Sequence, residues 1–228
     1  MVMARTAPQS VKTSGAEIRL TLERLFALYP VQRWWPGDTP FEIAAGAVLV
    51  QNARWRNAEL ALEQLRTHNL LVPERVAQAS FEDLASVIRS SGTFRVKAAR
   101  LQALSKWWQR ESSQSLTMPT ATLRTSLLKV QGIGEETADC ILLYAFQRPV
   151  FVADAYARRW LGRVGLVATD AAYRHVQLFA HTYMPQTAAW LGAAHAAIVE
   201  HGKAYCGRTP RCSTCPLAAR CDYAGAQR

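Results

Sequence analysis

Apolar residues recur at spacings of three and four along most of this chain, which is the period of one face of an α-helix. In residues 16–29, for example, Ile18, Leu22 and Leu25 fall on one such face. The strict apolar–polar alternation of a half-buried strand is absent, and only residues 148–154 look extended. The sequence therefore predicts an all-α fold.

Further helices are expected wherever this period continues between proline and glycine breaks. They cover residues 41–52, 56–67, 81–90, 95–110, 122–130, 135–147, 169–182 and 186–204. Another should follow Asp154, which stands where a helix N-cap belongs. The segment 41–52 is almost wholly apolar, so it could be a buried strand or a buried helix, and its alanines favour a helix.

The net charge and the length of the chain limit the classes of partner that it is expected to bind. The 228 residues have a formal net charge of +10, and half of them are hydrophobic, so we expect a packed core and a polyanionic partner, either nucleic acid or an anionic membrane surface. No run reaches the roughly 18 apolar residues of a membrane span. Residues 1–15 lack the apolar core of a secretory signal and are interpreted as a flexible tail. We expect a cytoplasmic monomer without a membrane segment.

Residues 127–146 predict two helices joined by a very short turn that contains Gly132 and Gly134. Glycines can adopt positive φ and let another backbone approach closely. Amides at the start of the second helix would suit a phosphate oxygen, a contact that positions DNA without reading its sequence. Gly-x-Gly alone is equally typical of an ordinary helical hairpin, but the wider pattern, apolar-x-Gly-apolar-Gly-x-x-Thr-Ala, is more specific.

Four cysteines lie within sixteen residues near the end of the chain. They are Cys206, Cys212, Cys215 and Cys221, with gaps of five, two and five residues. Four thiolates can hold a [4Fe–4S] cluster or a structural zinc, and disulfides are a weaker third interpretation for a cytoplasmic protein. Cys140 stands apart and is expected to be a small core residue.

The pattern at residues 130–138, followed by Asp154, resembles the helix–hairpin–helix DNA glycosylases of the endonuclease III superfamily. The resemblance covers roughly residues 20–225. It implies two helical lobes, with double-stranded DNA and a flipped damaged base as the ligand. The implied domains are a six-helix lobe with the hairpin at residues 40–150, and a lobe formed by residues 16–39 and 151–228 that carries an iron–sulfur loop at 206–221.

The same resemblance gives Asp154 the catalytic role. Breaking an N-glycosidic bond builds positive charge on the sugar, which a nearby carboxylate stabilises while it helps to orient water. An aspartate at a helix start is otherwise simply a cap. Members that also cleave the strand carry a lysine two residues after the second hairpin glycine, where this chain has Glu136. A carboxylate cannot form a Schiff base, so a monofunctional enzyme is predicted.

The resemblance also favours [4Fe–4S] over zinc at the four cysteines. Members commonly show gaps of six, two and five residues, and the first gap here is one residue shorter. The implied role is structural, holding a basic loop against phosphates.

A run of six basic residues without an acidic one extends from Arg89 to Arg110 and supports a surface that contacts phosphates. Lys97 belongs to this run and is predicted to bind DNA. Residues 90–101 resemble the family's loop that wedges into the duplex, which would place Thr93 or Phe94 at the wedge.

The combination of Trp34-Trp35-Pro36, Gln51-Asn52 and Trp55 is similar to the bacterial 3-methyladenine glycosylases of the endonuclease III-like kind. This similarity implies a base pocket of Trp34, Trp35 and Trp55, in which we also place Glu136, and a Gln51 side chain that fills the hole left in the duplex. Aromatic rings attract cations, and N3- or N7-methylated purines are positively charged.

The sequence thus predicts a monofunctional DNA glycosylase of base excision repair, with alkylated purines as the first substrate class and oxidised pyrimidines as the second. A bifunctional endonuclease III-like glycosylase and abasic-site lyase that uses another amine is the enzyme alternative. A non-catalytic protein that binds damaged DNA is the alternative from another class. The hairpin disfavours a zinc-ribbon adaptor.

Overall fold

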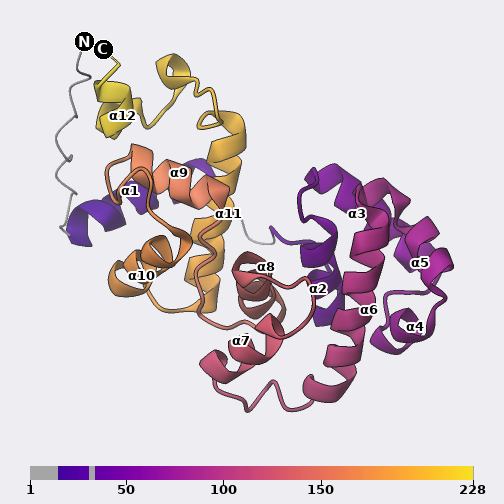
Figure 1. The fold of residues 1–228 in the computed structure, drawn as a ribbon. Coiled ribbons are helices and arrows are strands. Elements are labelled where there is room, and N and C mark those ends of the chain that lie inside the picture. The colour runs from indigo at the N-terminus through magenta and orange to yellow at the C-terminus, as the bar shows by residue number, and fades with distance from the viewer. Residues whose placement is uncertain (1–14, 31–33, 228) are drawn as a thin grey trace, which may run out of the picture. The chain divides into compact units, whose positions relative to one another are not determined.

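The computed structural model describes residues 15–30 and 34–227, and these contain helices and turns but no strand (Figure 1). The all-α prediction is therefore confirmed. The segment 148–154, which looks extended in the sequence, has no regular secondary structure. Apart from Gly15, the predicted tail at residues 1–15 lies outside the described residues.

The chain divides into two compact units. The hairpin unit consists of residues Trp35–Pro149, and the terminal unit combines the described residues up to Trp34 with those from Val150 onward. Each chain crossing from one unit to the other falls beside a proline, Pro36 or Pro149.

The hairpin unit is built around the long helix α6. Its elements are α2 (Pro40–Leu49), α3 (Trp55–Thr67), α4 (Pro73–Gln78), α5 (Phe81–Val87), η1 (Arg89–Ser91), α6 (Phe94–Glu111), α7 (Thr120–Leu128), α8 (Glu135–Cys140) and η2 (Ile141–Ala145). Helices α2, α4 and α5 all pack against α6. The apolar segment at 41–52 is a helix, because Thr39 caps it by accepting a hydrogen bond from the Glu42 amide at 3.1 Å and Pro40 occupies its first turn.

Helix α4 has no counterpart among the predicted helices. It has six residues, of which only Val76 is buried, so it is too short to show a helical period in the sequence. Proline at its first position fixes φ for a helix start, and packing against α6 stabilises the rest.

The terminal unit joins the two ends of the chain. Its elements are α1 (Gly15–Leu28), α9 (Ala155–Arg163), α10 (Tyr173–Tyr183), α11 (Ala188–Ala204), η3 (Cys212–Thr214), η4 (Ala218–Arg220) and α12 (Asp222–Gly225). Helix α11 packs against both α1 and α9. Ile18, Leu22 and Leu25 of α1 are fully buried, as their spacing predicts.

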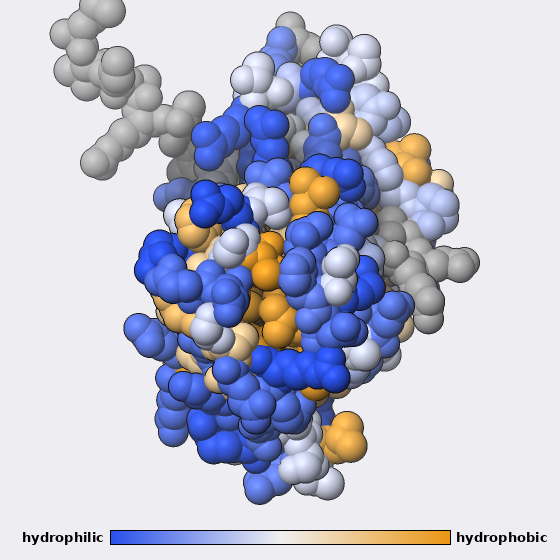
Figure 2. Space-filling model, turned by 90° about the vertical axis from the view of Figure 1, so that its right-hand side faces the viewer, coloured by the Kyte–Doolittle hydropathy of each residue, from blue (hydrophilic) through white to orange (hydrophobic). Residues whose placement is uncertain are grey.

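One face of the described chain is largely polar. Hydrophilic residues cover most of the face shown in Figure 2, and apolar residues gather there in a central band. Among the described helices, none combines the length and the apolarity that crossing a membrane requires.

Candidate functional site

The predicted hairpin is formed by α7, a short turn and α8. Gly132 in the turn has φ +82°, a left-handed conformation that favours glycine, and a Cβ at this position would also overlap the Arg100 side chain. Gly134 has φ −91°, and a Cβ added there would have no other atom within 4 Å, so neither its backbone nor its surroundings require glycine. Both glycines are exposed, so the turn is accessible to a ligand.

A buried ion pair fixes the two hairpin helices to each other. Arg124 of α7 donates to both carboxylate oxygens of Asp139 in α8, at 2.6 and 3.0 Å, and the Asp139 side chain is fully buried. Glu135 lies 3.5 Å from the same guanidinium but is partly exposed. This bidentate pair restrains the orientation of α7 relative to α8, and therefore the orientation of the turn between them.

Gln51 is held on the hairpin turn. Its Nε2 donates to the Gly132 carbonyl at 3.1 Å and to the Thr137 hydroxyl at 2.8 Å, and its Oε1 accepts from Arg100 Nη1 at 2.5 Å. The sequence predicts a DNA-facing role for Gln51 and for Gly132 separately. The structure brings them together, and it adds Arg100, which the sequence places only within the basic run.

Lys97 is not on the surface. Its side chain is 1% exposed, and its ammonium donates to the Leu49 carbonyl at 2.7 Å and to the Ser91 carbonyl. Burial, together with the nearby charge of Arg100, lowers its pKa. This placement does not fit the predicted phosphate contact, because the ammonium is already enclosed and bonded. Lys97 instead ties the end of α2 to the loop that precedes α6.

The expected wedge lies at the start of α6. Gly92 has φ +92°, Thr93 is the exposed N-cap residue, and Phe94 is half-buried beneath the Arg89 guanidinium, which lies 5.1 Å from the ring centroid. Thr93 is therefore better exposed than Phe94 for an insertion into a duplex.

Three half-buried aromatic rings gather in the hairpin unit. Trp35 stacks on Tyr144 with centroids 5.1 Å apart and meets Trp55 edge to face at 5.3 Å. Tyr144 belongs to η2, a π-helical turn that directly continues α8. Turns of this kind are rare in proteins as a whole, but those that occur are often found at functional sites. The predicted pair Trp35 and Trp55 is thus brought together, and Tyr144 is a third ring that helical periodicity could not reveal.

Glu136 lies exposed in the first turn of α8, next to Glu135. Carboxylates at a helix start interact favourably with the helix dipole. They also leave the first turn of α8 without an amine that could attack a sugar.

Asp154 caps α9. Its Oδ1 accepts from the Ala157 amide at 2.8 Å, and its Oδ2 lies 3.6 Å from Nε2 of His195, a residue of α11 that is 2% exposed. Burial alone raises the pKa of Asp154, but His195 and the amides of Ala157 and Tyr156 outweigh it, so the pKa is lowered. The carboxyl is therefore ionised at neutral pH, as a charge-stabilising group must be.

Trp34 belongs to the terminal unit and packs edge to face on His195, with centroids 5.3 Å apart. Its Nε1 donates to Glu200 at 2.9 Å, and Lys203 donates to the same carboxylate oxygen at 2.8 Å. Trp34 and Asp154 therefore both lie next to the same residue, His195. Trp35 and Trp55 belong to the other unit.

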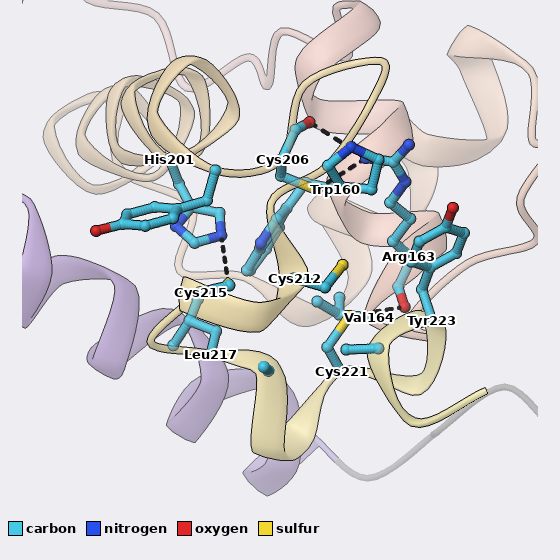
Figure 3. Close-up of a pocket in the computed structure, with 14 residues that line it drawn as sticks. Trp160, Arg163, Val164, His201, Cys206, Cys212, Cys215, Leu217, Cys221 and Tyr223 are labelled. Atoms are coloured by element: carbon cyan, nitrogen blue, oxygen red, sulfur yellow. Dashed lines mark hydrogen bonds between the residues drawn. The ribbon is translucent and has the colours of Figure 1, made fainter. Parts of the chain in front are cut away.

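The four cysteines line one pocket (Figure 3). His201, which is 1% exposed, places Nε2 3.6 Å from Cys215 Sγ, and Arg163 lies 3.3 Å from Cys206 Sγ while it donates to the Gly207 carbonyl at 2.7 Å. The backbone of the loop is thus held by an arginine, and the four cysteines line the same pocket.

The thiols influence one another. Burial raises the pKa of Cys215, and the negative charges of the other three cysteines raise it further. Within the described residues, no three His, Cys, Asp or Glu side chains converge closely enough to hold a metal ion. A single zinc needs four sulfurs about 2.3 Å from one point, whereas a four-iron cluster keeps its thiolates farther apart. Four thiols that line one pocket are a donor set that either group could use.

Comparison with known proteins decides the family. Residues 45–186 match the HhH-GPD superfamily of base excision DNA repair proteins. A protein of Methanocaldococcus jannaschii that is named a putative DNA repair glycosylase is 35% identical over 202 residues, 86% of this chain and 92% of its own. The chain belongs to the HhH-GPD superfamily. As a member, it is a DNA glycosylase of base excision repair.

Two further proteins extend this result. Endonuclease III of Thermotoga maritima is 29% identical over 81% of this chain and 83% of its own. The crystal structure of a Helicobacter pylori 3-methyladenine DNA glycosylase bound to 1,N6-ethenoadenine has a TM-score of 0.71 and 29% identity, and it covers 84% of this chain and 98% of that one. The HhH-GPD fold predicted from the hairpin is confirmed.

Proposed function

We propose that this glycosylase is monofunctional and removes alkylated purines from double-stranded DNA. The observation that carries the proposal is the cluster of Trp35, Trp55 and Tyr144. A flat, positively charged base gains both stacking and cation–π attraction from such rings. The H. pylori glycosylase, to which this chain is 29% identical, is a 3-methyladenine glycosylase that binds 1,N6-ethenoadenine.

Asp154 is the proposed catalytic residue. An N3- or N7-alkylated purine is already a good leaving group, so the reaction needs stabilisation of the sugar cation more than a strong acid. A largely buried, ionised carboxylate supplies that stabilisation. The lowered pKa of Asp154 supports this role.

The absence of lyase chemistry is proposed from Glu136. A Schiff base requires an amine, and Glu136 occupies the position at which lyase members of the superfamily carry lysine. Lys97, the lysine nearest to the wedge, is enclosed and bonded to two carbonyls, so it is not positioned to replace that amine.

The four cysteines are proposed to bind a [4Fe–4S] cluster. Such a cluster would hold the basic loop around Arg208, Arg211 and Arg220 in one conformation for contact with phosphates. Iron and acid-labile sulfide analysis of the purified protein tests this assignment, and stoichiometric zinc without iron would contradict it.

The decisive experiment uses duplexes that each carry one defined lesion: N3-methyladenine, 1,N6-ethenoadenine, thymine glycol or uracil. Each reaction is analysed with and without alkali. Strand breaks at the alkylated purines that appear only after alkali support the proposal. The Asp154→Asn variant is the matched control, because it keeps the shape of the side chain and removes its charge.

A bifunctional enzyme acting on oxidised pyrimidines is the second candidate, because the relative from T. maritima is an endonuclease III. It predicts nicking of the thymine glycol duplex without alkali and covalent trapping with borohydride. Binding without excision of any lesion would instead support a non-catalytic DNA-binding protein.

A further inference from the structure

Three segments of the hairpin unit that are expected to face DNA converge on helix α6. Lys97 of α6 binds the carbonyls of Leu49, at the end of α2, and of Ser91, at the end of η1 just before α6. One helical turn later, Arg100 reaches Gln51. Helix α6 therefore links the Gln51 segment, the wedge loop and the hairpin turn.

The Gln51 carboxamide is almost fully used within this arrangement. Both of its N–H donors and one acceptor site are occupied, by Gly132, Thr137 and Arg100. A glutamine side chain otherwise samples many rotamers, and fixing it costs conformational entropy. In the free protein the carboxamide is already fixed against the turn, so this entropy cost does not arise again when DNA binds.

Arg100 is suited to this role by more than one contact. Its aliphatic part lies against Gly132, where the missing Cβ leaves space for it, and its guanidinium donates to Gln51. The glycine therefore serves two purposes, a left-handed turn and room for the arginine. A charged donor to a neutral acceptor is among the stronger hydrogen bonds.

We infer that Arg100 is a positioning residue that couples Gln51 to the hairpin turn, so that binding of the turn to the DNA backbone carries the Gln51 side chain to the gap left by the extruded base. This inference rests on the proposed function as a DNA glycosylase and on the predicted role of Gln51 as the side chain that fills the gap in the duplex. It makes Arg100 act through Gln51 rather than as a further phosphate contact.

The test compares two duplexes that differ at one position. One is undamaged, and the other contains a tetrahydrofuran abasic-site analogue opposite 2-aminopurine, whose fluorescence reports how strongly the 2-aminopurine base itself is stacked in the duplex. Dissociation constants for both duplexes are measured at several salt concentrations. No base is excised in this assay, so the choice of lesion does not affect it.

We expect Arg100→Ala to reduce the preference for the abasic duplex about tenfold, as for the loss of one hydrogen bond to a charged group. Gln51→Ala should have the same effect, and the double variant should be no worse than either single variant. The fluorescence change should be lost in all three. Affinity for the undamaged duplex and its salt dependence should stay unchanged.

Two further variants keep the test decisive. Thr137→Val removes a partner of Gln51 without changing charge or shape, and about a threefold loss of preference is expected. Arg75→Ala is the matched control: its guanidinium donates to the Asn69 carbonyl at 3.1 Å in the same unit, and the preference should not change.

Equal weakening of both duplexes by Arg100→Ala, with the salt slope reduced by about one, would identify a phosphate contact and overturn the inference. Additive effects of Arg100→Ala and Gln51→Ala would also overturn it. If excision of alkylated purines succeeds while this coupling fails, the inference is wrong and the proposed function stands.

Discussion

The hairpin and the cysteine loop at residues 206–221 are stabilised in different ways. In the hairpin, a buried ion pair and the bonds of Gln51 join segments far apart in sequence. The cysteine loop contains only the short turns η3 and η4, and Arg159 and Arg163 hold its first residues through the Cys206 carbonyl. We infer that the chain alone determines the hairpin geometry, whereas the cysteine loop depends on a group bound among its sulfurs.

Loss of one cysteine ligand should separate the two regions most clearly. In Cys215→Ala we expect loss of iron and at least about a hundredfold faster tryptic cleavage within 206–221, because a structural metal site contributes on the order of 10 kcal/mol to folding. Fragments of the hairpin unit should remain protected. Mass spectrometry of the digest and iron analysis provide the measurement.

Cys140→Ala is the control for that experiment. Cys140 is buried in α8 and does not line the cysteine pocket. The variant should keep its iron and its resistance to trypsin. A Cys215→Ala protein that is as resistant as the native chain would show that the loop needs no bound group.

The stability of the hairpin should depend instead on its own ion pair between Arg124 and Asp139. Asp139→Asn removes the fully buried carboxylate charge that Arg124 binds through two hydrogen bonds, and we expect a loss of about 3 kcal/mol in the free energy of unfolding. Urea unfolding followed by tryptophan fluorescence measures this loss. Glu135→Gln is the matched control, because that carboxylate is partly exposed and its pair with Arg124 should contribute at most about 1 kcal/mol. Equal losses in the two variants would contradict this reasoning.

Local features of both units were predictable from the sequence. The buried face of α1, the cap at Asp154 and the left-handed turn at Gly132 each follow from residues within a few positions of one another. Such patterns are recognised by helical spacing and turn chemistry. The four cysteines were recognisable as a group, because their spacing is local too.

Contacts between distant segments could not be predicted in the same way. Arg100 meets Gln51, and Tyr144 stacks on Trp35, only because the helices fold together. The interpretation of Lys97 as a surface residue missed an available signal. It shares a helical face with Leu101 and Leu104, which are fully buried. The positive charge of Lys97 alone therefore led to the prediction of an exposed side chain, whereas the side chain is buried.

A smaller effect is expected within the hairpin turn. Gly132→Ala should destabilise the protein by about 1–2 kcal/mol, because alanine is strained at φ +82° and its Cβ displaces Arg100. Gly134→Ala should cost less, since its backbone is extended and open space surrounds it. Thermal unfolding of the two variants measures the difference. Equal costs would mean that the left-handed turn is not a constraint.

The smallest expected effect is a shift in pH dependence in the terminal unit. Burial raises the pKa of Asp154, and His195 contributes most to the net lowering. In His195→Asn the pKa of Asp154 should therefore rise. If the ionised carboxylate is the active form, the acidic limb of the kcat/KM profile for an alkylated purine should move to higher pH.

The same substitution, His195→Asn, should also lower the folding stability at neutral pH. A carboxyl whose pKa is lowered in the folded state adds stability above its unfolded pKa, and that stability is lost as pH falls through the folded value. His195→Asn removes part of this contribution, so the variant should lose stability relative to the native chain at neutral pH and less so in acid. An acidic limb at the native position would show that His195 does not control the ionisation of Asp154, and the lowered pKa would then have to come from the amides of Ala157 and Tyr156 alone.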